Sequence, residues 1–405
     1  MKKIMKPYEH FVANILRAAG TARTDPGAVT GLVQDALKNA GLMPGASTPP
    51  PPNNGTGFVD LNAAPAWARK AAPPQPDPVP DSVPEAGAGA MPDALPASMA
   101  ALAARFKAFQ AGHAARPRAA RDTSAEPGQF LQGSFSNAAG ARNYRLYVPA
   151  RATAGPRPLV VMLHGCTQDA DDFAAGTMMN ALAEEHGCLV LYPEQPKSAN
   201  ANACWNWFEA GHQGSGQGEP AILAGMTREV LREHGGDAER VFVAGLSAGG
   251  AMAAILGAAY PELYAAVGVH SGLAVGSAHD LMSALNAMKG ARAAKQHGGV
   301  GRLPAIVFHG DSDATVHASN GEAVLRQFTG GATLRSTEER GRDAGGRSHT
   351  RTVLHDGGGR AVAEHWVLHG GGHAWSGGST AGSYAEAAGP NASAEMLRFF
   401  LAQGR

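Results

Sequence analysis

The chain lacks several features that settle a protein's class at once. Only three of its 405 residues are cysteines, which excludes a disulfide-rich scaffold. Basic and acidic side chains both number 34, and a chain with no net charge offers no general attraction to nucleic acid or to an anionic membrane. No apolar run reaches the roughly 18 residues of a transmembrane helix. These absences favour a globular protein with an uncharged substrate or partner.

Motifs that bind cofactors are missing as well. No cysteine and histidine spacing is that of a metal site. The glycine-rich segment 211–218 does not follow a first strand in the way that a phosphate-binding loop does. We therefore expect no cofactor and no metal.

Proline is abundant but unevenly placed. Residues 44–96 include four consecutive prolines and favour extended, unpacked chain. Residues 98–112 then place large apolar side chains near one helix face, which packs on a core or docks on a granule or partner. We predict a helical and proline-rich disordered appendage over residues 1–128 and a catalytic domain over residues 129–405.

The first residues give an expectation for the compartment. The basic start of the chain is typical of a signal peptide, but Asn14 and Arg17 interrupt the apolar core that such a peptide needs. We expect a cytoplasmic protein.

The strongest chemical signal is V-F-V-A-G-L-S-A-G-G at residues 241–250. An apolar β-branched run predicts a buried strand, and a helix is expected over residues 248–259. Glycines two residues either side of Ser247 permit a sharp turn that exposes its hydroxyl. The pattern predicts a nucleophile elbow with Ser247 as the nucleophile, and the alternative is a glycine-rich turn with an incidental serine.

A serine nucleophile needs a base and an acid that orients the base, later in the chain and in the order acid, then histidine. Residues 303–310 read as a buried strand, and Asp313 follows it. Residues 364–369 read as a last strand, and a glycine run leads from it to His373. We expect Asp313 to fix the tautomer of His373 and to stabilise its charged form.

Other residues compete for these two roles. Asp311 also follows the strand, but the pattern H-G-x-x-D-x-x-V places the acid at Asp313. His365 and His369 lie within the predicted strand, where histidine is more often structural. His270 ends another strand with no acid beside it, and we interpret it as structural.

The oxyanion hole is predicted from a third strand, residues 158–163, which ends in H-G-C. In this kind of site one backbone N–H comes from such a loop and another from the residue after the nucleophile. Cys166 and Ala248 are the expected donors, and His164 is expected to shape the loop.

Short apolar strands alternate with helical stretches along the rest of the chain. This alternation predicts a mostly parallel sheet with crossover helices and a site at the carboxyl ends of the strands. Residues 142–148 are expected to form its edge strand. The further strands are expected at residues 159–163, 188–192, 241–246, 265–270, 305–309 and 365–368, with helices at 221–234 and 394–402.

Five motifs together resemble the poly(3-hydroxybutyrate) depolymerase family of esterases over residues 129–403. The resemblance implies an α/β-hydrolase fold with helices on both faces of the sheet, and it puts Ser247, Asp313 and His373 in the triad positions. The motifs are L-H-G-C-T-Q at 163–168, C-W-N-W-F at 204–208, G-L-S-A-G-G at 245–250, H-G-D-S-D-A-T-V at 309–316 and G-G-G-H-A-W at 370–375.

The resemblance implies hydrolysis of short-chain polyhydroxyalkanoates, or of their oligomers, through an acyl-enzyme. Feruloyl and acetylxylan esterases share the fold and parts of the motifs, and they stay as alternatives. A non-catalytic granule-associated or scaffold protein is an alternative of another class. Secretion is common in the family, which keeps an extracellular location open. Some members carry a C-terminal polymer-binding module that does not follow residues 394–402, so we expect slow attack on crystalline polymer.

Trp205, Trp207 and Trp375 are candidate walls of a substrate groove, with core packing as the alternative. Cys166 and Cys204 lie in loops expected to border the site, and an oxidising compartment would permit a disulfide between them. Cys188 is expected to be a buried thiol.

Overall fold

The computed structural model describes residues 127–290, 303–330 and 333–404. Nearly all of the predicted appendage, including the proline-rich segment and the apolar stripe of residues 98–112, lies outside the described residues. The division at residue 128 therefore stays a prediction. No helix in the described ranges is long and apolar enough to cross a membrane.

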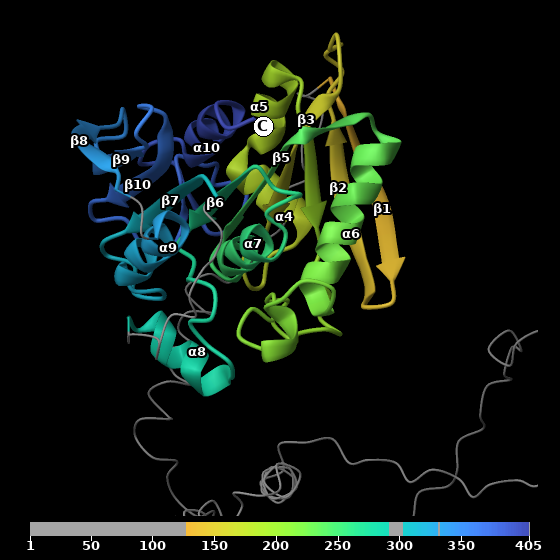
Figure 1. The fold of residues 1–405 in the computed structure, drawn as a ribbon, viewed down its shortest axis with the longest axis horizontal. Coiled ribbons are helices and arrows are strands. Elements are labelled where there is room, and N and C mark those ends of the chain that lie inside the picture. The colour runs from red at the N-terminus through yellow and green to blue at the C-terminus, as the bar shows by residue number, and fades with distance from the viewer. Residues whose placement is uncertain (1–126, 291–302, 331–332, 405) are drawn as a thin grey trace, which may run out of the picture. The chain divides into compact units, whose positions relative to one another are not determined.

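One large sheet organises the described residues, with strand order β1-β2-β4-β3-β5-β6-β7-β10-β9-β8 (Figure 1). The six strands from β4 to β10 in this order are mutually parallel, and the strands outside them pair antiparallel. The strands are β1 (Gln129–Asn137), β2 (Gly140–Val148), β3 (Arg157–Leu163), β4 (Leu189–Pro193), β5 (Gly236–Leu246), β6 (Ala266–His270), β7 (Ala305–Gly310), β8 (Arg335–Arg342), β9 (Ser348–His355) and β10 (Ala361–Leu368).

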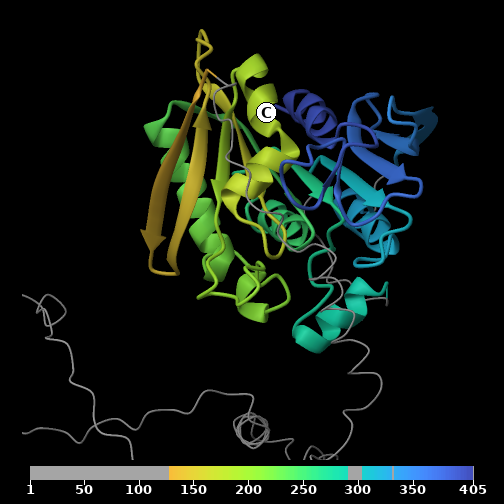
Figure 2. The same cartoon turned by 180° about the vertical axis from the view of Figure 1, so that it is seen from behind.

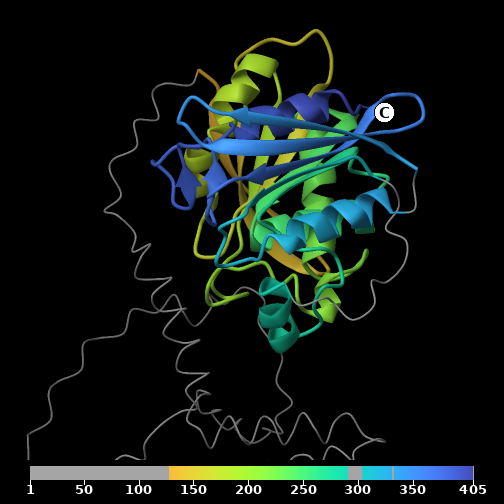
Figure 3. The same ribbon diagram turned by 90° about the vertical axis from the view of Figure 1, so that its left-hand side faces the viewer.

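Helices cover both faces of the sheet, as the two opposite views show (Figures 1 and 2). Figure 3 views the sheet from its β8 end, with α9 and α10 on opposite sides. A short pair, β11 (Trp375–Ser376) and β12 (Ala385–Glu386), lies outside the large sheet. The helices are α4 (Ala170–Thr177), α5 (Met179–His186), η3 (Ala210–His212), α6 (Gly218–Glu233), α7 (Ala248–Ala259), α8 (Leu281–Met288), α9 (Ser319–Thr329) and α10 (Ala392–Leu401).

The alternation along β3 shows why the sheet needs both layers. Leu159, Val161 and Leu163 pack into a core with side chains of α6, α7 and α9. Val160 and Met162 pack into a second core with side chains of α4, α5 and α10. A strand whose successive side chains are all buried is typical of a parallel sheet covered on both faces. This arrangement confirms the predicted fold class.

Most predicted elements are present, and α7 has the predicted bounds. The expectation that residues 142–148 form an edge strand is wrong, because β1 pairs with the full length of β2. Among the strands of the large sheet, β1, β8 and β9 were not predicted. In β8 every residue except Gly341 is exposed, so the strand carries no apolar alternation for the sequence to reveal.

Candidate active site

Ser247 occupies the turn between β5 and α7, with φ 58° and ψ −119°. A non-glycine residue with positive φ is strained, and strain of this kind is typical of a nucleophile elbow. The turn is held in place because the Ser247 N–H donates to the carbonyl of His270 at 2.9 Å. The local geometry is therefore the one that the motif predicts.

The glycines of the elbow allow neighbouring backbone segments to approach one another closely. A side chain on Gly249 would overlap the carbonyl oxygen of Leu163, and one on Gly245 would overlap the backbone of Gly249. Neither glycine has a positive φ. The sharp turn is borne by Ser247, while Gly245 and Gly249 let β5, α7 and the end of β3 pack backbone to backbone.

Asp313 and His373 meet at the ends of two adjacent parallel strands. The last pair in the ladder of β7 and β10 joins Gly310 to Leu368, and the two residues follow these ends. The Nδ1 atom of His373 lies 2.7 Å from Oδ2 of Asp313. Both side chains are buried, with 8% and 0% of their surface exposed.

The remaining oxygen of Asp313 is also satisfied. Its Oδ1 accepts from the backbone N–H groups of Thr315 at 2.9 Å and Val316 at 2.8 Å. Burial opposes ionisation of this carboxyl, but the hydrogen bond and charge of His373 and the Val316 N–H outweigh it and lower its pKa below the ordinary value. An ionised Asp313 requires His373 Nδ1 to be the donor.

The Ser247 hydroxyl makes no hydrogen bond to His373 within the described ranges. Catalytic hydrogen bonds are often long before substrate binds and tighten in the complex. All three residues follow the carboxyl ends of parallel strands, which share one edge of the sheet.

The competing acid has a partner of its own. Oδ2 of Asp311 lies 2.9 Å from Nδ1 of His369, and both side chains are more than 40% exposed. His365 is buried in β10, and burial lowers its pKa to about 4. In the described residues, neither His365 nor His369 makes a hydrogen bond or ion pair with Asp313, whereas His373 does.

His270 is structural. It is fully buried and stacked between Phe308 and Trp375, and burial lowers its pKa to about 3. Its Nε2 accepts from the N–H of Ser376 at 3.1 Å. A neutral imidazole whose acceptor nitrogen already accepts a hydrogen bond has no free lone pair with which to act as a general base.

The loop after β3 lies against the elbow. A side chain built on Gly165 would come within 3.6 Å of the Ser247 Cβ. His164 is fully buried, with Nδ1 on the Gly165 carbonyl at 2.8 Å and Nε2 accepting from the Gln195 N–H at 3.1 Å. Gln168 Oε1 accepts from the Gly165 N–H at 2.9 Å. The buried histidine and Gln168 thus fix the backbone course of the H-G-C turn.

Ala248 is the first residue of α7, so its N–H is one of the four at a helix start that have no acceptor within the helix. Cys166 follows Gly165 in the loop beside Ser247. The two expected oxyanion donors therefore lie on segments that flank the nucleophile.

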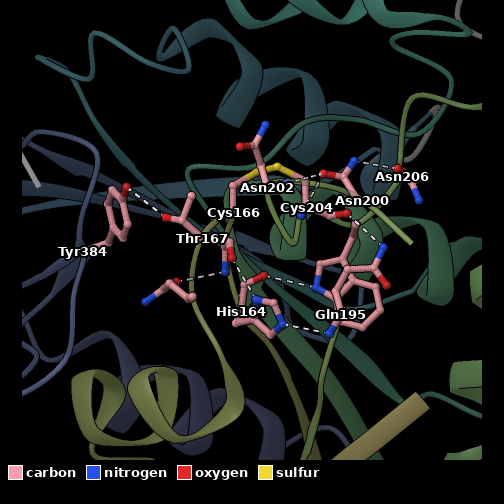
Figure 4. The surroundings of a disulfide bond; sticks show 12 residues. His164, Cys166, Thr167, Gln195, Asn200, Asn202, Cys204, Asn206 and Tyr384 are labelled. Carbon is pink, nitrogen blue, oxygen red and sulfur yellow. Dashed lines mark hydrogen bonds between the residues drawn. A yellow bond between two sulfur atoms is a disulfide. The ribbon is translucent and has the colours of Figure 1, made fainter. Parts of the chain in front are cut away.

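A disulfide between Cys166 and Cys204 joins this loop to the segment 204–208 (Figure 4). Alongside it, the Thr167 N–H donates to the Asn202 carbonyl at 2.7 Å, and the Thr167 hydroxyl lies 3.2 Å from that of Tyr384. Cys188 is a buried free thiol, and burial raises its pKa to about 12.

The three tryptophans do not line an open groove. Trp205 is fully buried and donates from Nε1 to the His164 carbonyl at 3.1 Å. Trp207 is 6% exposed and stands edge-on to Phe208. Trp375 is 1% exposed and donates to the Ser393 hydroxyl at 3.0 Å. The interpretation of these residues as substrate contacts is corrected: their indoles are core side chains that support the loops of the site.

Sequence reasoning missed Glu219, whose carboxylate is buried at the start of α6. It accepts from the N–H and Nδ2 groups of Asn206 at 2.8 Å each, and Arg142 lies 3.3 Å away. Glu219 thus holds the segment 204–208 in place through its hydrogen bonds to Asn206. The only signal was an acidic residue at a helix start, which is common on surfaces too.

The mostly parallel sheet covered on both faces, with Ser247 in the turn after β5, defines an α/β-hydrolase fold. The acetyl xylan esterase from Aspergillus awamori has the same fold, with a TM-score of 0.51 at 22% identity over 64% of this chain and 94% of that one. The chain belongs to the esterase PHB depolymerase family, whose model matches residues 142–345, just over half of the sequence.

Two curated relatives are also carboxylic ester hydrolases. Poly(3-hydroxyalkanoate) depolymerase C of Paucimonas lemoignei is 34% identical over 239 residues, which are 56% of this chain and 57% of the relative. Feruloyl esterase B of Thermothelomyces thermophilus is 30% identical over 212 residues, which are 48% of this chain and 72% of the relative. The chain thus spans little more than half the length of the first relative.

Proposed function

We propose that this protein is a serine esterase in which Ser247 is the nucleophile, His373 the general base and Asp313 the acid that orients it. The observation that carries the proposal is the 2.7 Å contact between His373 Nδ1 and Asp313 Oδ2 at the strand edge that also holds the strained Ser247. Membership of an esterase family supports it.

The proposed reaction uses these groups in order. With Nδ1 donating to Asp313, His373 Nε2 takes the hydroxyl proton as Ser247 attacks the ester carbonyl. The backbone N–H groups of Cys166 and Ala248 hold the oxyanion. His373 then protonates the leaving alcohol, and water activated by the same base hydrolyses the acyl-enzyme.

We propose short-chain polyhydroxyalkanoates, such as poly(3-hydroxybutyrate), or their oligomers as the substrate. The relative from Paucimonas lemoignei and the absence of net charge support an uncharged polyester. A feruloyl or acetyl ester is the second candidate, because the feruloyl esterase relative is matched over more of its own length. Turnover of hydroxybutyrate oligomers, amorphous polymer, methyl ferulate and an acetylated xylan would separate them, and a preference for ferulate or acetyl groups would refute the first.

Labelling with a fluorophosphonate probe separates the enzyme from a non-catalytic scaffold. Ser247→Ala should abolish labelling and ester turnover, while the protein stays folded. Ser271→Ala is the matched control, because Ser271 also follows a central strand and has a positive φ of 51°. Undiminished labelling of the Ser247 variant would refute the assignment.

We also propose that the protein works in an oxidising compartment, which favours the extracellular alternative over the cytoplasmic expectation. The Cys166 to Cys204 bond supports this. Thiol titration of the denatured, unreduced protein isolated from its natural compartment should find one thiol of the three cysteines. A count of three thiols would refute this proposal and indicate a reducing compartment.

Granule association through the N-terminal region is a further proposal. Deletion of residues 1–123 should leave turnover of a small ester unchanged, because every residue assigned to the site lies downstream. The same deletion should weaken binding to polymer granules. Loss of small-ester turnover would contradict the proposed boundary at residue 128.

A further inference from the structure

A second aspartate and histidine pair lies on the same two loops as the proposed catalytic pair. Asp311 is two residues before Asp313, and His369 is four residues before His373. Nδ1 of His369 lies 2.9 Å from Oδ2 of Asp311, and Nε2 of His369 lies 2.8 Å from the hydroxyl of Thr350 on β9. The His369 ring is therefore held from both sides.

Asp311 also binds the backbone of the histidine loop. Its Oδ1 accepts from the Gly370 N–H at 2.7 Å, and its own N–H donates to the Leu368 carbonyl at 3.1 Å. The next residue, Ser312, donates its N–H to the Gly371 carbonyl at 3.1 Å. The two loops therefore continue side by side beyond the last strand pair, with Asp311 joining them.

The histidine loop needs such a restraint. Gly370, Gly371 and Gly372 precede His373 directly, and glycine has more backbone freedom to lose than any other residue. Gly370 itself has φ 70°, a left-handed conformation that suits glycine. Without a fixed first residue, this run would let His373 sample positions away from Asp313.

We propose that Asp311 is a positioning residue: its carboxylate fixes His369 and Gly370, and thereby holds His373 in register with Asp313 and Ser247. The proposal rests on the proposed function, because it assigns the role of a neighbour of that site. In the part of the chain that the structure describes, the Asp311 carboxylate hydrogen-bonds to His369, Gly370 and Ser312 and not to Asp313, so its proposed effect is on the placement of His373.

Asp311→Ala should lower kcat on a small soluble ester by about 10²-fold, because a displacement of about 1 Å in a catalytic group has an effect of this size. KM should change by less than about threefold, since ground-state binding does not use the base. Asp356→Ala is the matched control. Asp356 accepts from the N–H groups of Gly358 and Arg360 in the turn at the other end of β9 and β10, and its loss should leave kcat unchanged.

The conservative variant supplies a second readout. In Asp311→Asn the amide oxygen still accepts from Gly370, and the amide nitrogen donates to His369 once that ring adopts the other tautomer and donates to Thr350. Activity should return to within about fivefold of the wild type. His369→Ala removes only the ring contact and should fall between Asp311→Ala and the wild type.

The decisive comparison uses a background without the base. In His373→Ala, the further change Asp311→Ala should not lower the residual turnover, because a residue that acts through His373 has nothing left to position. An equal loss of activity in both backgrounds, or a kcat for Asp311→Ala within twofold of the wild type, would overturn the proposal. Full activity in His373→Ala alone would instead refute the proposed function.

Discussion

Asp313→Asn is the substitution whose outcome the structure determines most sharply. Oδ1 of Asp313 accepts from the N–H groups of Thr315 and Val316, and Oδ2 faces His373. An asparagine keeps the two backbone hydrogen bonds only if its oxygen occupies the Oδ1 position. The amide NH2 then faces Nδ1 of His373.

That orientation forces His373 into the wrong tautomer. Nδ1 must present its lone pair to the amide, so the ring proton moves to Nε2. A protonated Nε2 has no lone pair with which to accept the proton of Ser247. The opposite amide orientation would leave two backbone N–H groups without an acceptor, at about 1–3 kcal/mol each. We expect kcat to fall by ~10⁴, a rise in the activation barrier of about 5 kcal/mol.

Turnover of a soluble short-chain ester, with thermal unfolding as the control for folding, measures this effect. Asp311→Asn is the matched control, because it removes the same charge two residues away and should keep its activity within the roughly fivefold range expected above. If Asp313→Asn stays near wild-type activity while Asp311→Asn does not, the acid is Asp311 and the assignment fails.

Three further outcomes follow from the packing around the site. Reduction of the Cys166 to Cys204 bond, which spans 38 residues, should lower the free energy of unfolding by about 4 kcal/mol and also reduce kcat. Urea unfolding and ester assays with reductant measure both effects, and unchanged values would contradict the view that this bond holds the loop of Cys166 in place. Trp205→Phe keeps an aromatic ring but loses the hydrogen bond to the His164 carbonyl, so the free energy of unfolding should fall by about 1–3 kcal/mol. Its kcat should drop at constant KM, whereas a raised KM would mean that the ring contacts substrate. The folded-state pKa values of His270 and His365, about 3 and about 4, lie below the ordinary value of 6.5, so the unfolded chain binds protons first and stability is lost as pH falls from that value. His365→Leu should therefore remove up to about 1.4 kcal/mol per pH unit of this loss, measured by urea unfolding at pH 7 and pH 5.

The sequence predicted the part of the fold that is dictated by burial. The central strands are continuous apolar runs, because a parallel sheet covered on both faces requires such runs. The helix α7 has the predicted bounds. Strands β8 and β9 escaped prediction because β9 is held by backbone pairing to β10, and β8 by backbone pairing to β9, and not by an apolar face. Their polar composition is also that of a loop.

The backbone geometry of the candidate site was predictable where a motif constrains the backbone and not where side-chain packing decides. The glycines around Ser247 and the strand ends before Asp313 and His373 are local signals. The exposure of Trp205 and Trp375 has no such local signal, because tryptophan occurs both in cores and in substrate grooves. Nor does spacing reveal that Asp311 joins His369 across 58 positions.

β8 is the last strand of the sheet within the described residues, and this edge bears on whether copies of this chain pair with one another. An exposed strand of eight residues is a template for a second strand, and proteins commonly blunt such edges with charge. If β8 met its own copy in the centred antiparallel register, Arg335 would face Arg342 and Glu338 would face Glu339. Like charges directly opposite one another disfavour a strand pair. The same arginine and glutamate side chains that hide this strand from prediction thus disfavour this pairing of β8 with a second copy of itself.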